Sequence, residues 1–203
     1  MNKEHSPKEK AIYRAVVELF EEGADLNSLT VSEITAKAGI GKGTAYEYFS
    51  DKEEMIAKAL FYNIEAYCES LYRGMSKEEN LYDKMNYILL SMEKQLTETN
   101  CLIRLDHMLC DHSSTGDRIR ELKEKKTSDE MLPVDLIRRV LYDEIPDRDA
   151  ISENVITYLG MSIFAKILCY AMLLDEGKYG SDEERKNMRE LICRGICREI
   201  EEM

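Results

Sequence analysis

The chain has 203 residues, of which 44% are hydrophobic and 33% are charged, with only 10 Gly and 3 Pro. This composition excludes a disordered or collagen-like chain and favours helices joined by short connections, so we expect an all-α fold with a sizeable core. The net charge of −12 argues against broad binding to polyanions, because neutralising phosphates supplies most of the energy of such binding.

The amino end of the chain, residues 1–6, is charged and lacks the apolar stretch of a secretory signal. We therefore expect a cytoplasmic protein. In that compartment the six Cys are expected to be reduced thiols that pack as small hydrophobes rather than a disulfide framework.

Five segments carry the capping-box pattern, in which a Ser or Thr and a Glu three residues later satisfy each other's backbone donors at a helix start. They are residues 6–9, 30–33, 50–53, 76–79 and 181–184. Apolar residues then recur at helical spacing, as at Ile12, Val16 and Phe20. The combined pattern predicts helices near residues 7–22, 31–38, 42–48, 51–73, 77–97, 101–111, 116–126, 134–144, 149–175 and 182–201.

Residues 30–49 are predicted to form two short helices joined by a tight turn. Gly39 falls where the first helix must end in a left-handed residue, a conformation that Gly adopts without steric cost. The spacing of Ile34 on the first helix, and of Ala45 and Phe49 on the second, places them on the sides that face the core. This is the arrangement of a helix-turn-helix.

The outer face of the second helix follows from this packing. Lys42 and Tyr46 lie four residues apart and point away from the core, and Thr44 and Tyr48 flank them. With small Gly43 near its start, such a helix can enter a DNA major groove and let the backbone approach phosphates closely. The alternative role for the two Tyr side chains is half-buried packing.

Residues 8–60 contain, in order, Ile34, Ala38-Gly39-Ile40, Lys42-Gly43-Thr44, Tyr46, Tyr48-Phe49 and Lys52-Glu53-Glu54. This series resembles the helix-turn-helix and the following helix of the TetR family of repressors. The match is specific because so many of the family's residues occur within a short segment. Three positions depart from the family's pattern. Thr35 stands where a small Ala is usual, Ala45 where a bulkier aliphatic residue is usual, and Gly41 in place of the common Ser cap.

The resemblance implies that seven residues bind DNA: Thr30, Lys42, Gly43, Thr44, Tyr46, Tyr48 and Lys52. The first three residues of the second helix would approach base edges or phosphates, and the two Tyr would contact the DNA backbone. Thr30 and Lys52 would hold phosphates at helix starts. For Lys52 the alternative is a merely solvated helix end.

The resemblance also implies two domains, a helix-turn-helix DNA-binding domain at residues 1–52 and an effector-binding and dimerisation domain at residues 53–203. Residues 1–52 hold seven Lys or Arg against nine acids, a charge of −2, which leaves −10 of the total −12 for residues 53–203. Within residues 3–14 there are four basic residues and two acids, and within residues 30–52 there are three of each. The expected DNA-binding face is therefore locally neutral to weakly basic, although the whole chain is acidic.

Residues 150–174 are apolar nearly all round, and such a helix needs burial on more than one side. Its most apolar run carries Lys166 and is short for a membrane span, so we expect a core helix and no membrane anchor. The resemblance implies that residues 150–174 and 182–201 pair across a two-fold axis in a homodimer, which suits a palindromic operator. Cys193 and Cys197 are expected to pack at this dimer seam.

The resemblance further implies a pocket for a small-molecule effector among the middle helices. Met and Tyr side chains there could line an adaptable apolar cavity with a few hydroxyl donors, although ordinary core packing is the alternative. The candidate lining residues are Tyr62, Tyr67, Met85, Met92, Met108, Tyr142, Phe164 and Tyr170. The identity of the effector, and whether it releases or promotes DNA binding, are left open.

Residues 106–112 gather His, Cys and Asp side chains, but no second ligand pair accompanies them, so neither a metal nor another cofactor is expected. No convergent catalytic set is evident, which argues against an enzyme. The sequence therefore predicts a ligand-responsive transcriptional regulator, a repressor that binds a palindromic operator as a homodimer. The alternative is a helical oligomeric interaction module that has lost DNA binding.

Overall fold

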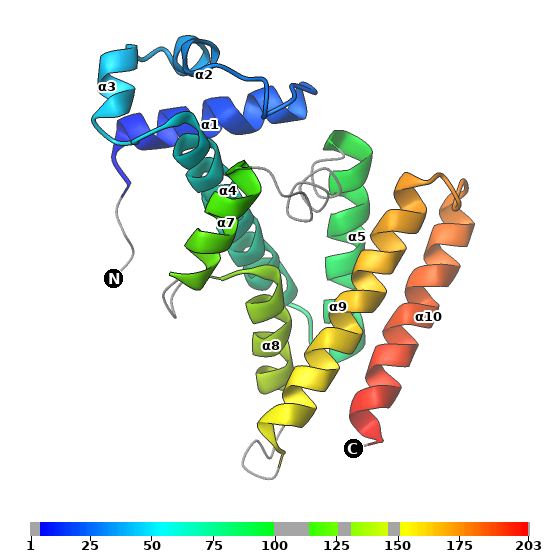
Figure 1. Cartoon of the computed structure of the whole chain (residues 1–203). Coiled ribbons are helices and arrows are strands. Elements are labelled where there is room, and N and C mark those ends of the chain that lie inside the picture. The colour runs from blue at the N-terminus through cyan, green and yellow to red at the C-terminus, as the bar shows by residue number, and fades with distance from the viewer. Residues whose placement is uncertain (1–4, 100–113, 126–130, 146–150, 203) are drawn as a thin grey trace. The chain divides into compact units, whose positions relative to one another are not determined.

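The computed structural model of the chain describes residues 5–99, 114–125, 131–145 and 151–202, and no strand occurs among them (Figure 1). The predicted all-α fold class is confirmed. The helices are α1 (Pro7–Glu21), α2 (Val31–Ala38), α3 (Lys42–Tyr46), α4 (Lys52–Met75), α5 (Leu81–Thr99), α7 (Ser114–Glu124), α8 (Pro133–Glu144), α9 (Glu153–Asp175) and α10 (Asp182–Glu201). The helix predicted near residues 101–111 lies outside the described residues.

Capping boxes explain why α1, α2 and α10 begin where the sequence predicts. Ser6, Thr30 and Ser181 each accept a hydrogen bond from the backbone N–H three residues later, and the Glu at that position accepts one in return. Each box satisfies two groups that a helix start would otherwise leave without partners. These three predicted starts are confirmed.

The box predicted at residues 50–53 is wrong by one residue. The Glu54 N–H donates to Asp51 Oδ1 at 2.7 Å, so the carboxylate of Asp51 caps α4. Ser50 instead donates its own N–H to Glu54 Oε2 at 2.6 Å. Asp and Ser are comparable caps, so the pattern alone could not choose between neighbouring positions.

The box predicted at residues 76–79 does not start a helix. α5 begins at Leu81, where the Asp83 N–H donates to Asn80 Oδ1 at 2.9 Å. The Ser76 hydroxyl donates back to a carbonyl oxygen at the end of α4. A better-placed Asn therefore takes over the capping role.

The chain divides into two compact units, one with residues 1–66 and 104–130 and the other with residues 67–103 and 131–203. The first part of α4 belongs to the first unit and its end to the second. The functional division predicted between residues 52 and 53 stays a prediction.

The core of the first unit is formed where α1 packs on α2 and α3. Ile34 and Ala45 have no exposed surface, and Phe49 is almost completely buried, as the sequence predicts. They meet the buried face of α1, which includes Val16 and Phe20. This packing decides which side of α3 remains in solvent.

The second unit packs α5, α8, α9, α10 and the end of α4 around its own core. α9 buries Ile156, Leu159 and Ile163 on one face, whereas Tyr158 and Met161 on another face are 66% and 68% exposed. Within one chain, α9 is therefore a core helix on one side only. By length and composition alone it is also the one membrane-span candidate among the described helices, with 33% of its most apolar window buried.

Candidate nucleic-acid interface

The turn between α2 and α3 depends on Gly39. Its backbone has φ 67° and ψ 29°, in the left-handed region, and the following Ile40 N–H donates to Thr35 O at 3.0 Å to close α2. A Cβ at Gly39 would meet no atom within 4 Å, so the backbone conformation alone is what favours Gly there. The predicted pivot of the helix-turn-helix is confirmed.

One face of α3 is open to solvent. Tyr46 is 54% exposed and Lys42 is exposed, whereas Ala45 has no exposed surface. Among the described residues, the Lys42 ammonium has no hydrogen-bond or ion-pair partner. A cation and a phenol thus stand together on the outer face of a short helix, where a nucleic acid could reach both.

The other residues predicted to bind DNA near this face differ in their exposure. Thr44 and Tyr48 are half-buried, while Gly43 and Thr30 are exposed. The Thr30 hydroxyl already donates to Glu33 Oε2 at 2.7 Å, within the capping box of α2. If Thr30 binds a phosphate, the contact would therefore come from its backbone N–H or from the hydroxyl that also bonds to Glu33.

Lys52 is engaged within the chain. Its Nζ donates to Asn27 O at 2.7 Å and lies 3.8 Å from Glu53 Oε1, which ties the loop between α1 and α2 to the start of α4. Sequence reasoning missed this contact because the partner is 25 residues away. The phosphate-binding role of Lys52 stays a prediction.

Thr35, which departs from the family's pattern, is accommodated without an unsatisfied polar group. The residue is buried, and its hydroxyl donates to Val31 O at 2.7 Å, one turn back along α2. A buried hydroxyl that keeps a hydrogen bond costs little free energy. The helix therefore tolerates Thr where Ala is usual.

A charged cluster that the sequence analysis missed lies at the start of α4. Glu54 accepts hydrogen bonds from Ser50 N–H and Oγ at 2.6 and 2.7 Å, and its other oxygen lies 2.7 Å from Lys58 Nζ. Lys58 Nζ is also 5.5 Å from the centre of the Phe49 ring. Burial raises the pKa of the Glu54 carboxyl, but the bonds from Lys58 and Ser50 outweigh it and lower the pKa to about 2.

This cluster predicts a loss of stability in acid. The Glu54 carboxyl has a pKa near 4.5 when unfolded and about 2 when folded, so its contribution is present above pH 4.5 and is lost as the pH falls toward 2. We expect Glu54→Gln to cost about 1–2 kcal/mol at pH 7 and to flatten this acid dependence, measured by thermal unfolding at pH 7, 5 and 3. Glu21→Gln, at an exposed position of α1, is the matched control. An unchanged acid dependence in Glu54→Gln would contradict the assignment.

Six of the eight candidates for the effector pocket lie in the second unit, in or against its core: Tyr67, Met85, Met92, Tyr142, Phe164 and Tyr170. Tyr62 belongs to the first unit, where its ring lies 5.2 Å from that of Tyr13. Met108 lies outside the described residues.

The hydroxyl groups of these candidates differ in their partners. Tyr170 OH donates to Glu93 Oε1 at 2.6 Å, and Tyr142 OH donates to Glu153 Oε2 at 2.9 Å. Tyr67 OH is buried and has no hydrogen-bond partner within the part of the chain that the structure describes. Burial raises the pKa of Tyr67 to about 12, so the phenol keeps its proton at neutral pH and can donate it.

Two expectations about Cys and His residues have separate outcomes. Within the described residues, no three His, Cys, Asp or Glu side chains are placed to hold a metal, and residues 106–112 lie outside that part of the chain.

The placement of Cys193 at a dimer seam is wrong, because this residue is fully buried in the core of the second unit. Burial also raises the pKa of its thiol to about 12. Cys197 is half-buried.

Comparisons with known proteins agree with this geometry. Residues 12–59 match the sequence model of the bacterial regulatory proteins of the tetR family. FadR from Bacillus subtilis, solved in complex with stearoyl-CoA, is 17% identical with a TM-score of 0.65 over 92% of this chain and 98% of that one. FadR from Bacillus halodurans is 19% identical, with a TM-score of 0.65 over 94% and 97%. Reduced NemR from E. coli is 17% identical, with a TM-score of 0.64 over 92% and 95%.

At these identities the solved structures show a shared fold, and a search of curated proteins found no match. The family-specific information comes from the amino-terminal match, which contains Gly39 and the exposed face of α3. Residues 12–59 therefore match the tetR family of bacterial regulatory proteins, and the chain as a whole shares the fold of these solved regulators.

Proposed function

We propose that the protein is a cytoplasmic repressor, without enzymatic activity, that binds a palindromic operator as a homodimer and responds to a small-molecule effector. The observation that carries this proposal is the exposed pair Lys42 and Tyr46 on α3, inside the segment that matches the family. An interaction module that had lost DNA binding would not need this face in solvent. Thr30, Gly43, Thr44, Tyr48 and Lys52 complete the proposed DNA-binding surface.

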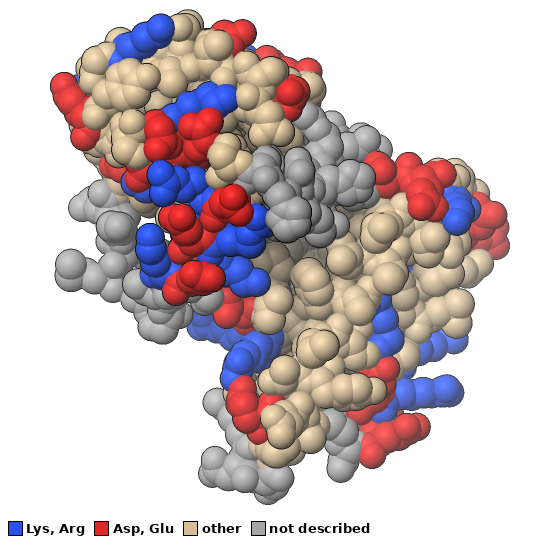
Figure 2. Space-filling view, in the orientation of Figure 1, with Lys and Arg blue, Asp and Glu red and all other residues tan. Residues whose placement is uncertain are grey.

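The proposed homodimer is supported by the outer face of α9. Tyr158, Met161 and Met172 form an exposed apolar stripe, and α10 adds exposed Leu191. Figure 2 shows few charged side chains over α9. Large exposed apolar patches mark association sites. In a two-fold dimer, the patch on one subunit is covered by the same patch on the other. We propose that residues 150–174 and 182–201 bury on the order of 2,000 Å² or more in this way.

The ammonium group of Lys166, the one Lys or Arg on α9, is paired within the chain. Lys166 Nζ lies 2.6 Å from both Glu199 Oε1 and Ser162 Oγ, and the Ser162 hydroxyl donates to Glu199 Oε2 at 2.9 Å. A paired Lys is easier to cover with a second subunit than an isolated one, because burying an unpaired charge costs far more. The polar cluster is therefore compatible with a dimer on this face.

The proposed effector site is the core of the second unit around Tyr67. Its buried hydroxyl has no hydrogen-bond partner among the described residues. A buried donor without a partner costs about 1–3 kcal/mol unless a ligand or water satisfies it. Met85 and Met92 offer adaptable apolar contacts in the same core. An effector with a long apolar part and an oxygen acceptor would suit these groups.

The DNA-binding proposal is tested with a duplex selected from a random-sequence pool by the purified protein. We expect Lys42→Ala and Tyr46→Ala each to weaken binding to this duplex by about ten- to a hundredfold, because each removes a contact worth about 1–3 kcal/mol. Both side chains are exposed, so the melting temperature should not change. Lys77→Ala, at an exposed position of the second unit, is the matched control. Unchanged affinity of both α3 variants for the selected duplex would contradict the proposal.

Stearoyl-CoA is the first effector to test, since it is bound in the similar FadR structure from Bacillus subtilis. At a hundredfold excess over its Kd, we expect it to stabilise the protein by about 2.7 kcal/mol and to release the selected duplex. Thermal unfolding and fluorescence anisotropy measure the two effects, with coenzyme A alone as the control. Absence of both effects would remove this acyl-CoA as the effector and leave the DNA-binding proposal standing.

A further inference from the structure

Each of the three acids at the start of α4 has a basic partner within ion-pair distance. The pairs are Asp51 with Arg118, Glu53 with Lys52, and Glu54 with Lys58. Lys52 and Lys58 belong to α4 itself, whereas Arg118 comes from α7, 67 residues beyond Asp51. The balance of charge at this helix start therefore depends on a distant part of the chain.

The packing of α7 holds Arg118 in place. Thr115 and Ile119 are four residues apart on this helix and both are buried, so one side of α7 packs against protein. α7 also belongs to the same compact unit as the start of α4. From the position before Ile119, the Arg118 guanidinium donates to Asp51 Oδ2 at 3.1 Å and to Glu121 Oε2 at 3.2 Å. It is thus fixed between a carboxylate of its own helix and the carboxylate that caps α4.

The Asp51 carboxylate uses both of its oxygens. Oδ1 accepts the Glu54 N–H at 2.7 Å, and Oδ2 accepts hydrogen bonds from Ser50 Oγ at 3.1 Å and from Arg118. The bond from the Glu54 N–H does most to lower the pKa of the Asp51 carboxyl, and Ser50 and Arg118 add to it against the opposing effect of burial. Asp51 therefore keeps its negative charge at neutral pH even if Arg118 is removed.

The charge of Asp51 lies beside the proposed DNA-binding surface. Asp51 directly precedes Lys52 and follows Tyr48 by three residues, and both of these belong to that surface. Neighbouring Cα atoms are about 3.8 Å apart, whereas at about 0.01 M salt an exposed charge acts over about 30 Å. The Asp51 and Arg118 side chains are 37% and 42% exposed, so their charges face solvent. Phosphates held at Lys52 or Tyr48 would therefore be repelled by an unpaired Asp51.

We propose that Arg118 is a positioning residue for DNA binding, which neutralises Asp51 beside the duplex phosphates while Asp51 continues to cap α4. The inference rests on the proposed DNA-binding function. Arg118 acts here through Asp51 and needs no contact of its own with the duplex. α7 lies outside residues 12–59, so the match with the tetR family does not include this residue.

The test is a double-mutant cycle on the full chain with the selected duplex at about 0.01 M salt. Arg118→Gln leaves the charge of Asp51 unpaired, so affinity should fall by about tenfold for a dimer, and this loss should shrink as added salt screens the charge. Asp51→Asn removes the charge but keeps the cap, because Asn caps a helix as well as Asp does. It should bind at least as tightly as wild type. In the Asp51→Asn background, Arg118→Gln should change affinity by less than about twofold.

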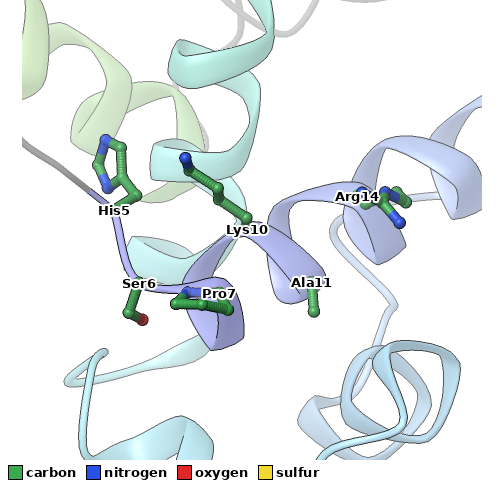
Figure 3. Close-up of a pocket in the computed structure, with 6 residues that line it drawn as sticks. All are labelled: His5, Ser6, Pro7, Lys10, Ala11 and Arg14. Atoms are coloured by element: carbon green, nitrogen blue, oxygen red, sulfur yellow. The ribbon is translucent and has the colours of Figure 1, made fainter.

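Two further variants separate this role from folding and from general charge. Arg118→Lys keeps the positive charge and should keep the affinity within about twofold of wild type. Lys10→Gln removes one charge from α1, where Lys10 is exposed and lines an open depression of about 610 Å³ (Figure 3). The effect of Lys10→Gln, whatever its size, should be the same with and without Asp51→Asn, since distant sites act additively.

Three results would count against these proposals. Unchanged affinity in Arg118→Gln would overturn the inference. A loss of affinity in Arg118→Gln that persists in the Asp51→Asn background would also overturn it, and would indicate that Arg118 binds phosphate directly. Wild type that binds no duplex at low salt would overturn the proposed function as well.

Discussion

Met161→Asp is expected to turn the proposed dimer into a monomer at micromolar concentration. Met161 is 68% exposed and lies on α9 near Tyr158, in the stripe proposed to meet a second copy. A two-fold interface would bury the new carboxylate twice, at about 3 kcal/mol or more each time. The dimer Kd should rise by roughly ten-thousandfold, and sedimentation velocity measures this directly.

Val134→Asp is the matched control for this substitution, because Val134 is a 50% exposed apolar residue at the start of α8, away from the stripe. It should leave the dimer intact. Circular dichroism should show unchanged helix content in both variants, since neither side chain belongs to the core. A Met161→Asp protein that sediments as a dimer at micromolar concentration would rule out this interface.

Inserting five base pairs between the half-sites of the selected duplex is expected to abolish specific binding. Two recognition helices of one dimer meet successive major grooves about 34–36 Å apart on one side of the duplex. Half a helical turn moves one half-site to the opposite side, so one α3 loses its bases. Affinity should drop to that for random DNA, a loss of about a thousandfold or more, in gel-shift titrations.

The acidic charge of the chain makes the expected loss of specific binding easier to measure. Residues 53–203 carry −10 of the net −12, so non-specific binding at physiological salt should be weak and cannot mask the loss. A duplex with the original spacing but altered spacer sequence is the control and should bind normally. Equal affinity for every spacing would show that a rigid dimer does not read two half-sites.

Much of the amino-terminal unit follows from contacts between residues three or four positions apart. The capping boxes of Ser6 and Thr30, and the left-handed Gly39, are local features whose energetics do not depend on the rest of the fold. The inward side of α3 follows from the spacing of Ala45 and Phe49. For the same reason, the outward direction of Lys42 and Tyr46 could be predicted without a structure.

Local rules failed where two residues compete for one role or where a partner lies far along the chain. Asp51 took the cap predicted for Ser50, because both types accept the same hydrogen bond. Cys193 and Cys197 are one turn apart on α10, yet Cys193 is completely buried in the core whereas Cys197 is half-buried. Spacing identifies a shared face of a helix but not what that face meets.

The sequence by itself determined the helices, most of their ends and the residues on the outer face of α3, since each depends on short-range geometry. The tertiary structure alone decided which polar groups meet over long distances in the sequence. Lys52 reaches Asn27 O across 25 residues, and Arg189 reaches Glu93 across 96 residues at 2.6 Å. Such partners meet only when helices pack, because the distance between two helix faces depends on every side chain between them.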